Sequence, residues 1–184
     1  MNLLKEVIFI LKNKKIILYP TDTVWGIGCD ATDEIAVKKI YALKNREETK
    51  SLIILVDSIV MLKQYVEKVP EKALEIIQNA TKPTTIIYKN PKNLAKNTIA
   101  QDNTIAIRIA QDDFCKQLIK AFKKPIVSTS ANVSGEPTPR CFSEISKAIL
   151  NNVDYVVDLH REKITQQSSI ILKIEDGKVS TIRE

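Results

Sequence analysis

Residues 19–31, YPTDTVWGIGCDA, form a polar, glycine-containing segment between two elements of different periodicity. Before it, 16–19 is a short apolar run typical of a buried strand, and Pro20 ends it. After it, apolar residues in 33–44 recur with a helical period, and Asp30 or Thr32 is the expected N-cap. A strand, a polar loop and a helix in this order indicate an α/β fold, in which loops at strand ends often carry ligand-binding groups.

Outward from this segment, helices and strands alternate along the chain. Helical periodicity predicts helices at 3–11, 33–44, 57–66, 71–79, 112–122 and 142–150. Short apolar runs predict strands at 16–19, 51–56, 84–88, 104–109, 125–128, 155–159, 169–174 and 179–183. Asp176-Gly177 is typical of a two-residue hairpin turn, so the last two strands must pair antiparallel. We therefore expect one α/β domain over residues 1–184, with helices flanking a twisted sheet of mixed parallel and antiparallel strands.

The composition excludes several classes of protein. The 184 residues suit one hydrophobic core, and 44% hydrophobic with 27% charged residues is ordinary for a globular chain. No apolar stretch approaches the roughly 20 residues of a membrane span, and the N-terminus lacks a cleavage site, so we expect a cytoplasmic protein without membrane association. Three distant cysteines give no disulfide framework, one histidine gives no His-rich zinc site, and four glycines build no P-loop or GxGxxG turn.

Two further segments concentrate polar chemistry. STSANVSGEPTPR, at 128–140, follows a predicted strand and carries five hydroxyls, an asparagine and a glycine. Such a cluster suits hydrogen bonding to phosphate or to a small polar ligand, although Ser and Asn are also common in plain surface loops. LKNR, at 43–46, places Lys44 and Arg46 at a predicted helix end, where basic residues also simply complement the helix dipole.

The charge balance favours an anionic ligand. A net charge of +6 suits either a nucleotide or RNA phosphates, and the charge alone leaves that choice open. Only five of the 28 basic residues are arginine, and the lysines are dispersed as on a solvated surface. We therefore expect the guanidiniums to lie where planar, bidentate recognition matters, at Arg46, Arg108, Arg140 and Arg183.

Taken together, YPTDTVWGIG, IYALKNR and STSANVSGEP resemble the motifs of the Sua5/YciO/YrdC family, in particular its short threonylcarbamoyl-AMP synthases. The resemblance extends from the first predicted helix to the last hairpin and implies a YrdC-like domain with an open basic cleft. It also implies that L-threonine, bicarbonate or CO2, and ATP are condensed to threonylcarbamoyl-AMP and pyrophosphate. Downstream threonylcarbamoyl transferase proteins would then use this product to modify adenosine 37 of tRNA.

The resemblance assigns site residues motif by motif. The K-x-R and S-x-N elements supply a catalytic set that also contacts ATP, namely Lys44, Arg46, Ser130 and Asn132. Contacts to threonine fall on Thr21, Lys50, Arg108 and Ser128. Further contacts to ATP fall on Thr85, Ser134, Thr138 and Arg183.

Such a site is chemically sufficient for adenylate formation. Attack of a carbamate on the α-phosphate needs charge neutralisation and in-line positioning more than a covalent nucleophile. The motifs hold no carboxylate cluster, so Mg2+ is expected to arrive on the triphosphate, with no metal site of the protein and no organic cofactor. Asp22 is the acid inside YPTDTVWGIG, and it either orients the loop or binds the threonine amine.

Three segments depart from the family pattern and concern details of the pocket. Glu47 stands where relatives often have proline, 81–85 (TKPTT) replaces a P-G-P-x-T sequence, and 167–170 (QSSI) replaces a Pro-Ser-Thr-Ile type sequence.

Two other functions remain open. One is an RNA-binding protein of the same fold that holds tRNA or double-stranded RNA, and the other is a paralogue with a different carbamoyl-type substrate. The sequence has no RNP-type aromatics, GXXG loop or RGG tract, and aromatic residues make up only 5% of it. Stacking platforms for RNA bases are therefore not expected, which favours the enzyme.

Overall fold

The computed structural model describes residues 3–47, 52–165, 168–175 and 177–184. The helices in these ranges are α1 (Leu3–Lys12), α2 (Glu34–Leu43), α3 (Ile59–Tyr65), α4 (Glu71–Asn79), η1 (Lys96–Thr98), α5 (Asp113–Phe122), η2 (Phe142–Glu144) and α6 (Lys147–Leu150). The strands are β1 (Ile17–Tyr19), β2 (Gly26–Gly28), β3 (Ile53–Val56), β4 (Thr84–Lys89), β5 (Thr104–Ile109), β6 (Ile126–Ser130), β7 (Tyr155–Val156), β8 (Ile170–Glu175) and β9 (Lys178–Arg183).

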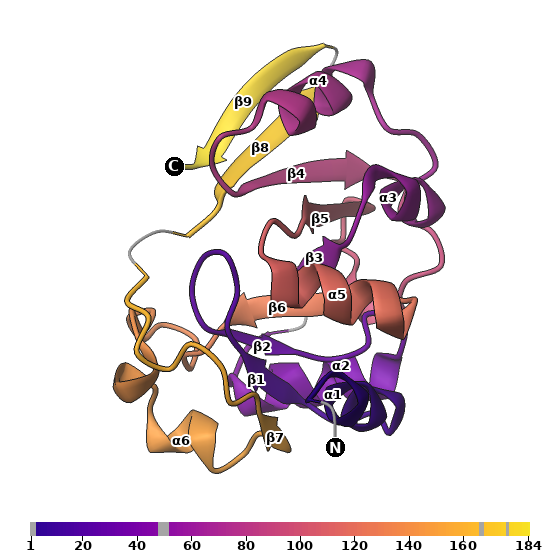
Figure 1. Cartoon of the computed structure of the whole chain (residues 1–184). Helices are drawn as coiled ribbons and strands as arrows, with labels where there is room; N and C mark the ends of the chain where they lie inside the picture. The colour runs from indigo at the N-terminus through magenta and orange to yellow at the C-terminus, as the bar shows by residue number, and fades with distance from the viewer. Residues whose placement is uncertain (1–2, 48–51, 166–167, 176) are drawn as a thin grey trace.

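The strands of the described residues form one mixed sheet in the order β7-β1-β2-β6-β3-β5-β4-β8-β9. The pairs β1–β7, β3–β5 and β4–β8 are parallel, and the other neighbours are antiparallel. In Figure 1 the sheet rises from β7 at the bottom to the β8–β9 hairpin at the top, so segments distant in the sequence lie side by side. This arrangement confirms the predicted α/β fold with a mixed sheet.

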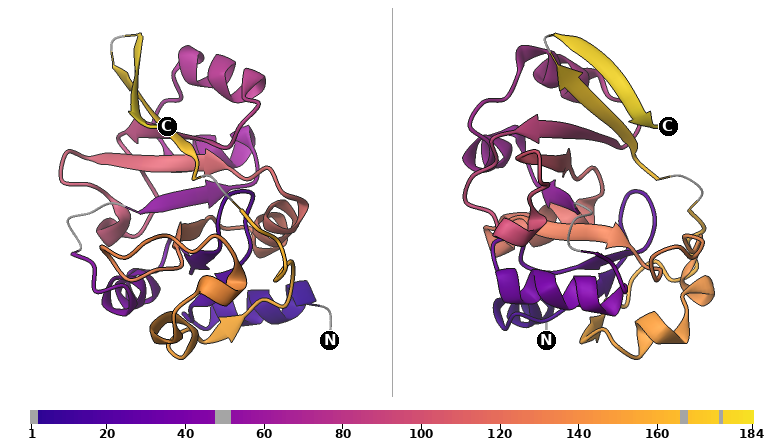
Figure 2. Two further views of the ribbon diagram at one scale, coloured as in Figure 1. Left: turned by 90° about the vertical axis from the view of Figure 1, so that its left-hand side faces the viewer. Right: turned by 180° about the vertical axis from the view of Figure 1, so that it is seen from behind.

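Helices cover the sheet through their apolar faces. α1 packs on α5 and β1, and α5 and α3 both contact β3. In Figure 1 and in the two views of Figure 2, α1 and α2 lie beside β1 and β2, and α3 and α4 lie toward the β8–β9 end. Val7 and Leu11 of α1 and Leu118 and Phe122 of α5 are buried, as their helical spacing predicts.

The N-terminus of α2 differs from the prediction that Asp30 or Thr32 caps it. The helix begins at Glu34, and Oδ1 of Asp33 accepts a hydrogen bond from the amide of Ala36 at 2.9 Å. Asp30 instead binds its own turn, where its Oδ1 accepts from the amide and the hydroxyl of Thr32. Since an N-cap side chain must reach the N2 or N3 amide, a shift of the helix start by one residue changes the cap.

The region after β6 is less regular than predicted. The helix expected at 142–150 is wrong in extent, because η2 and α6 are separated by Ile145, whose backbone is extended, and by Ser146.

β2, which the sequence did not predict, is only the three residues of a Gly-Ile-Gly run. β6 continues two residues past its predicted end, and β8–β9 form the predicted antiparallel hairpin. Ser51 and Asp176 lie outside the described residues.

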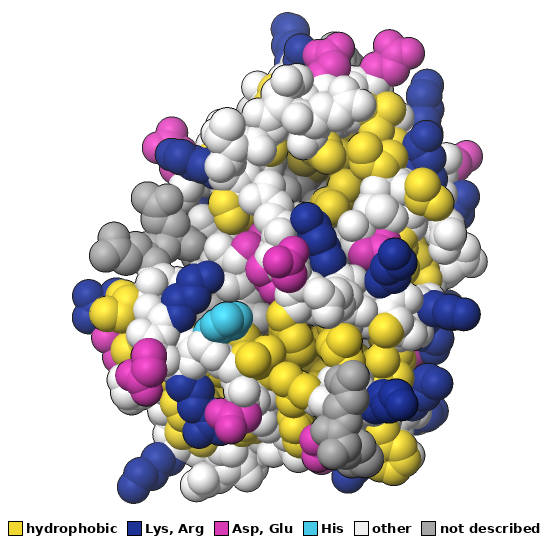
Figure 3. All heavy atoms as spheres, viewed as in Figure 1, with side chains coloured by type: hydrophobic (Ala, Val, Ile, Leu, Met, Phe, Trp, Pro, Cys, Tyr) yellow, Lys and Arg dark blue, Asp and Glu magenta, His cyan; other side chains and the backbone are white. Residues whose placement is uncertain are grey.

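The surface carries both signs of charge. On the face drawn in Figure 3, lysine and arginine side chains are spread out with acidic side chains among them, as the dispersed lysines of the sequence predict. In the part of the chain that the structure describes, no helix has the length and apolar character needed to cross a membrane.

Candidate functional site

A cleft of about 350 Å³ opens on one face of the sheet. The strands that contribute to it are β2, β3, β4, β5, β6, β8 and β9. The loop after β1 and the segment before β8 contribute as well. Its lining consists of Thr23, Val24, Gly26, Arg46, Leu52, Ile53, Ile87, Ala106, Arg108, Ser128, Thr129, Ser130, Thr138, Ser168, Ser169, Ile171, Ile182 and Arg183. No aspartate or glutamate is among these described residues, so the charged side chains of the lining are all basic and stand among neutral hydroxyls and apolar residues.

Strand register places the polar groups on this face. Directly opposite residues in neighbouring strands point to the same side of a sheet. Ile53 pairs with Ser128 on one side and with Ala106 on the other, and all three line the cleft. Arg108, two residues after Ala106, therefore shares the face and lies opposite Thr85.

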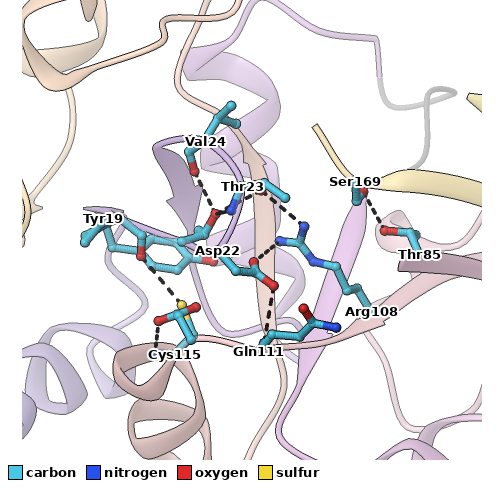
Figure 4. Close-up of polar contacts among 12 residues, drawn as sticks. Tyr19, Asp22, Thr23, Val24, Thr85, Arg108, Gln111, Cys115 and Ser169 are labelled. Atoms are coloured by element: carbon cyan, nitrogen blue, oxygen red, sulfur yellow. Dashed lines mark hydrogen bonds and ion pairs between the residues drawn. The ribbon is translucent and has the colours of Figure 1, made fainter. Parts of the chain in front are cut away.

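Arg108 connects β5 to the loop 21–25. Its Nη2 lies 3.0 Å from Oδ1 of Asp22, and its Nη1 donates to Oγ1 of Thr23 at 3.1 Å. Figure 4 shows the guanidinium directed toward the loop between these two side chains. Oδ2 of Asp22 also accepts from the amide of Gln111. Burial raises the pKa of the Asp22 carboxyl, and the guanidinium of Arg108 opposes that shift.

Arg183 of β9 anchors the segment before β8. Its Nε and Nη2 donate to the carbonyl oxygen of Ser169 at 3.1 and 2.9 Å, and Nη2 also donates to the Ser169 hydroxyl. That hydroxyl lies 2.8 Å from Oγ1 of the fully buried Thr85. Burial and the nearby Arg108 lower the pKa of Arg183. Thr85 therefore lies on the cleft face of β4 but is covered by Ser169, and it does not line the cleft itself.

The hydroxyl of Thr21 is used within its own loop. It donates to the carbonyl of Val24 at 2.7 Å and accepts from the amide of Thr23 at 3.0 Å. Thr23, rather than Thr21, lines the cleft. The loop rises beside β2 and β6, as the indigo loop of Figure 1 shows.

Gly28 allows the strand pair β1–β2 to pack closely. A Cβ atom there would lie 2.6 Å from Cε1 of Tyr19 and 2.7 Å from the carbonyl oxygen of Val127. The Tyr19 hydroxyl donates to that same carbonyl at 3.1 Å. At Gly26 a Cβ would meet its nearest atoms at 3.2–3.4 Å, one of them the hydroxyl of Ser128 in the cleft.

Lys44 lies at the C-terminal end of α2, and its side chain is buried. Nζ donates to the carbonyl oxygens of Ser130 and Asn132. Burial lowers the pKa of Lys44 to about 8, with a smaller effect of Arg46 in the same direction and an opposing effect of Glu136. Lys44 does not belong to the lining of the cleft, whereas Arg46 does.

Asn132 and Ser134 shape the loop that follows β6. Nδ2 of Asn132 donates to the carbonyl of Glu136 at 2.7 Å, and the amide of Ser134 donates to the carbonyl of Lys44 at 2.8 Å. Oδ1 of Asn132 and Oγ of Ser134 are buried without a hydrogen-bond partner among the described residues. Such atoms are rare in a folded chain and are often met by a ligand or water.

The structure therefore brings together half of the site residues that the sequence predicts, in the lining of one cleft: Arg46, Arg108, Ser128, Ser130, Thr138 and Arg183. A second group supports this lining from behind or beside it: Thr21, Lys44, Thr85, Asn132 and Ser134. Lys50 lies outside the described residues. Arg140 is not in the lining, since it is exposed and pairs with Glu144.

Several residues of the cleft lining are not among the predicted site residues, and Thr23 and Ser169 are the two that bond to predicted ones. Thr23 was part of the first motif, but its distance to Arg108 becomes visible only in the fold. Ser169 was assigned to a strand, whereas its hydroxyl links Thr85 to Arg183. The alternation of side chains along β4 and β8 could have indicated the role of Ser169. Thr85 lies opposite Ile171, and Ser169, two residues before Ile171, points to the same face.

In the part of the chain that the structure describes, no group of three His, Cys, Asp or Glu side chains is positioned to hold an ion. The cleft lining in particular contains no carboxylate side chain among the described residues.

Sequence comparison identifies relatives over almost the whole chain. The model of the Sua5/YciO/YrdC family, described as "Telomere recombination", matches residues 9–184. A threonylcarbamoyl-AMP synthase from Pseudoalteromonas translucida is 36% identical over 163 residues, 87% of each chain. A putative threonylcarbamoyl-AMP synthase from Methanocaldococcus jannaschii is 38% identical over 185 residues, 98% of this chain and 86% of that one.

Solved structures share the fold. P. abyssi Sua5 complexed with L-threonine matches with a TM-score of 0.87 at 23% identity, over 98% of this chain and 53% of that one. The present chain thus spans about half the length of that protein. E. coli YciO matches with a TM-score of 0.87 at 22% identity, over 99% of this chain and 88% of that one.

Proposed function

Because the chain belongs to the Sua5/YciO/YrdC family, we propose that it is a threonylcarbamoyl-AMP synthase. It would condense L-threonine, CO2 or bicarbonate, and ATP, and its product would serve the threonylcarbamoylation of adenosine 37 in tRNA. One observation carries the proposal beyond the family. Three of the five arginines of a lysine-rich chain line a single cleft, and no described acidic residue lines it.

The ATP end of the cleft is assigned to Arg46, Ser130, Thr138 and Arg183, whose positions in the lining support that role. Guanidiniums bind phosphate oxygens with two parallel hydrogen bonds, and hydroxyls add further donors. The unpaired Oδ1 of Asn132 and Oγ of Ser134 support the same assignment for those two residues. Thr85 would act indirectly, by holding Ser169 beside Arg183.

Threonine is assigned to the region of Arg108 and Ser128, with Thr21 holding the loop above it and Lys50 as a further predicted contact. Arg108 uses two of its nitrogens on Asp22 and Thr23, and its buried Nε has no partner among the described residues. A substrate carboxylate would supply an acceptor for a group of this charge. The apolar floor of Ile53 and Ala106 leaves room for the substrate beside it.

The proposed reaction has two steps. The threonine amine adds to CO2 and loses a proton, which gives a carbamate. A carbamate oxygen then forms a bond to the α-phosphorus of ATP, and the bond from that phosphorus to the β-phosphate oxygen breaks to release pyrophosphate. The chain's own contribution is to align the two anionic substrates and to neutralise the charge that develops on the phosphate oxygens. Mg2+ would enter as part of the ATP substrate.

The decisive experiment incubates the purified chain with ATP, L-threonine, bicarbonate and Mg2+ and searches for threonylcarbamoyl-AMP by mass spectrometry. Pyrophosphate release is measured in parallel, with each substrate omitted in turn. We expect release to require L-threonine and bicarbonate together. Release that is unchanged without threonine contradicts the proposal and favours a paralogue with another carbamoyl-type substrate.

The same preparation tests RNA binding as the main function. Affinity for tRNA or double-stranded RNA is measured over a series of salt concentrations, because counterion release makes such binding strongly salt-dependent. Tight binding at physiological salt, with no adenylate formed, would replace the enzyme by an RNA-binding protein of this fold.

A further inference from the structure

Lys44 joins α2 to the loop 130–136 by two routes. Through its side chain, Nζ donates to the carbonyls of Ser130 and Asn132. Through its backbone, its carbonyl oxygen accepts from the amide of Ser134 at 2.8 Å. One residue therefore fixes both the start and the middle of this loop.

The rest of the loop is closed around the same point. The amide of Ala131 donates to the carbonyl of Trp25 at 3.0 Å, and Asn132 donates through Nδ2 to the carbonyl of Glu136. Without the ammonium group, the carbonyls of Ser130 and Asn132 would lose the donor that holds them toward α2. The side chains of those two residues would then lose their fixed direction.

We propose that Lys44 is a positioning residue, which holds the backbone of 130–134 in the shape that binds ATP and does not contact the phosphates itself. This inference rests on the proposed function only in naming ATP as the ligand. A direct phosphate contact would need the ammonium group in the cleft, but Lys44 is 2% exposed and absent from the lining, while Arg46 is part of it.

Burial of the charged Lys44 side chain costs folding free energy, and a neutral side chain at this position would avoid that cost. Burying an ammonium group is unfavourable, and here its described hydrogen-bond acceptors are backbone carbonyls, not a carboxylate. The charged groups that act on it are Arg46, which opposes the cation, and Glu136, which favours it. A neutral apolar side chain of similar length would fill the same space but could not donate to two carbonyls.

The test compares Lys44→Met with Arg46→Met in the ligand-free protein and with ATP. Amide hydrogen exchange over 130–136 is measured without ligand, and ATP affinity is measured by calorimetry. We expect Lys44→Met to speed exchange at Ala131, Asn132 and Ser134 by about 10- to 100-fold, as the loss of charge-assisted hydrogen bonds predicts. We also expect it to weaken ATP binding. Arg46→Met is expected to weaken ATP binding while exchange in the loop stays at the wild-type rate.

Lys39→Met is the matched control, because Lys39 lies on the same helix and its Nζ also donates to a backbone carbonyl, that of Lys14, at an exposed site. It is expected to change neither exchange in 130–136 nor ATP affinity. Loss of ATP binding by Lys44→Met with unchanged loop exchange would overturn the proposal, because it would make Lys44 a direct ATP contact. Unchanged loop exchange together with unchanged ATP affinity would equally overturn it.

A measurement on the wild-type chain covers the case in which Lys44→Met does not fold. The neutral amine keeps two N–H donors but loses the charge that strengthens their hydrogen bonds. With Lys44 observed by NMR through its ε-carbon, loop exchange should therefore rise beyond the effect of base catalysis at the pH where Lys44 loses its proton. A loop that keeps its protection through that titration would contradict the proposal. None of these measurements uses threonine, so a chain that binds ATP but forms no adenylate would refute the proposed function and leave this inference standing.

Discussion

Oδ1 of Asp22 lies 3.0 Å from Nη2 of Arg108, and both side chains are almost completely buried. The pair ties the loop 21–25 to β5, and Oδ2 of Asp22 adds a bond to the amide of Gln111. Of the two roles that the sequence left open for Asp22, this geometry supports orientation of the loop. The carboxylate is engaged by the protein, and Asp22 does not line the cleft.

Asp22→Asn should therefore destabilise the protein. The amide keeps the size of the side chain but leaves the buried guanidinium of Arg108 without its counter-charge, at a cost of about 3 kcal/mol. Urea denaturation followed by circular dichroism measures the change. Asp158→Asn is the control, because its ion pair with Arg161 is exposed and should contribute less than about 1 kcal/mol. Equal losses for the two variants would contradict the role given to the Asp22–Arg108 pair.

Arg46→Ala should separate activity from stability. A basic side chain at a helix end contributes only about 0.3–1 kcal/mol through the dipole, whereas stabilisation of developing charge by one group is worth about 3–4 kcal/mol. We expect turnover to fall by two to three orders of magnitude on that basis, with little change in the free energy of unfolding. Arg140→Ala is the matched control, since Arg140 is exposed and paired with Glu144. Near-normal turnover in Arg46→Ala would show that Arg46 only complements the helix.

Gly28→Ala should lower stability, whereas Gly26→Ala should alter the cleft. At Gly28 the new methyl group meets a backbone carbonyl and the Tyr19 ring below 3.0 Å, so we expect a loss of about 1–3 kcal/mol in stability. At Gly26 the contacts are longer, and the methyl group enters the cleft beside Ser128. Thermal unfolding and ATP affinity are measured for both. If Gly28→Ala unfolds at the wild-type temperature, the close packing of β1 on β2 is not required.

Trp25 provides a probe of ligand binding. Its indole is 2% exposed and packs against Phe142 with ring centroids 5.0 Å apart, so it lies in the core. Its backbone carbonyl accepts from Ala131, next to the proposed ATP contacts. ATP added with threonine should therefore produce a saturable change in tryptophan emission. The change should weaken in Thr21→Ala, which loses the hydroxyl that holds the loop. Unchanged emission at concentrations that support turnover would contradict this prediction.

The pH dependence of ATP binding should follow Lys44. Its pKa is lowered from 10.5 to about 8 in the fold, so the ammonium that anchors the loop is lost as the pH rises through 8. ATP affinity should decrease over that range in the wild type and stay constant in Lys44→Met. Between pH 8 and 10.5 the unfolded chain holds the Lys44 proton and the folded chain does not, so this group makes the folded state more stable as pH rises. As the pH rises, the ATP affinity measured by calorimetry should therefore fall while the free energy of unfolding measured by urea denaturation rises. Parallel changes in the two quantities would contradict the assignment.

The longer elements followed from periodicity, whereas β2 did not. The helix at 71–79 and the strand at 104–109 were predicted with their observed bounds, because each is a continuous pattern with a clear start and end. β2 has only three residues, two of them glycine, and it exists because β1 and β6 flank it. The order of the strands depends on contacts between distant segments, which a local pattern cannot contain.

The motifs contained half of the predicted residues that line the cleft, but they did not indicate its geometry. Arg46, Ser130 and Arg183 come from three separate parts of the sequence. Ser130 and Arg183 line one cleft because β6 and β9 belong to one sheet, and Arg46 reaches it from the segment after α2. Lys44 could not be told apart from Arg46 by sequence. The two differ by the direction of their side chains at the end of α2, which the fold decides.

The position of β4 has a consequence for synthesis on the ribosome. β4 pairs on one side with β5, which follows it closely, and on the other with β8, which begins at Ile170. A nascent chain that has emerged only through β5 would thus present the outer edge of β4, with the apolar Ile86 and Tyr88, for many seconds of translation. Unpaired edges of this kind promote association between chains. Ribosome-bound intermediates of this protein should therefore depend on chaperones until β8 is made, and the cleft lacks Arg183, a proposed ATP contact, until β9 has also emerged.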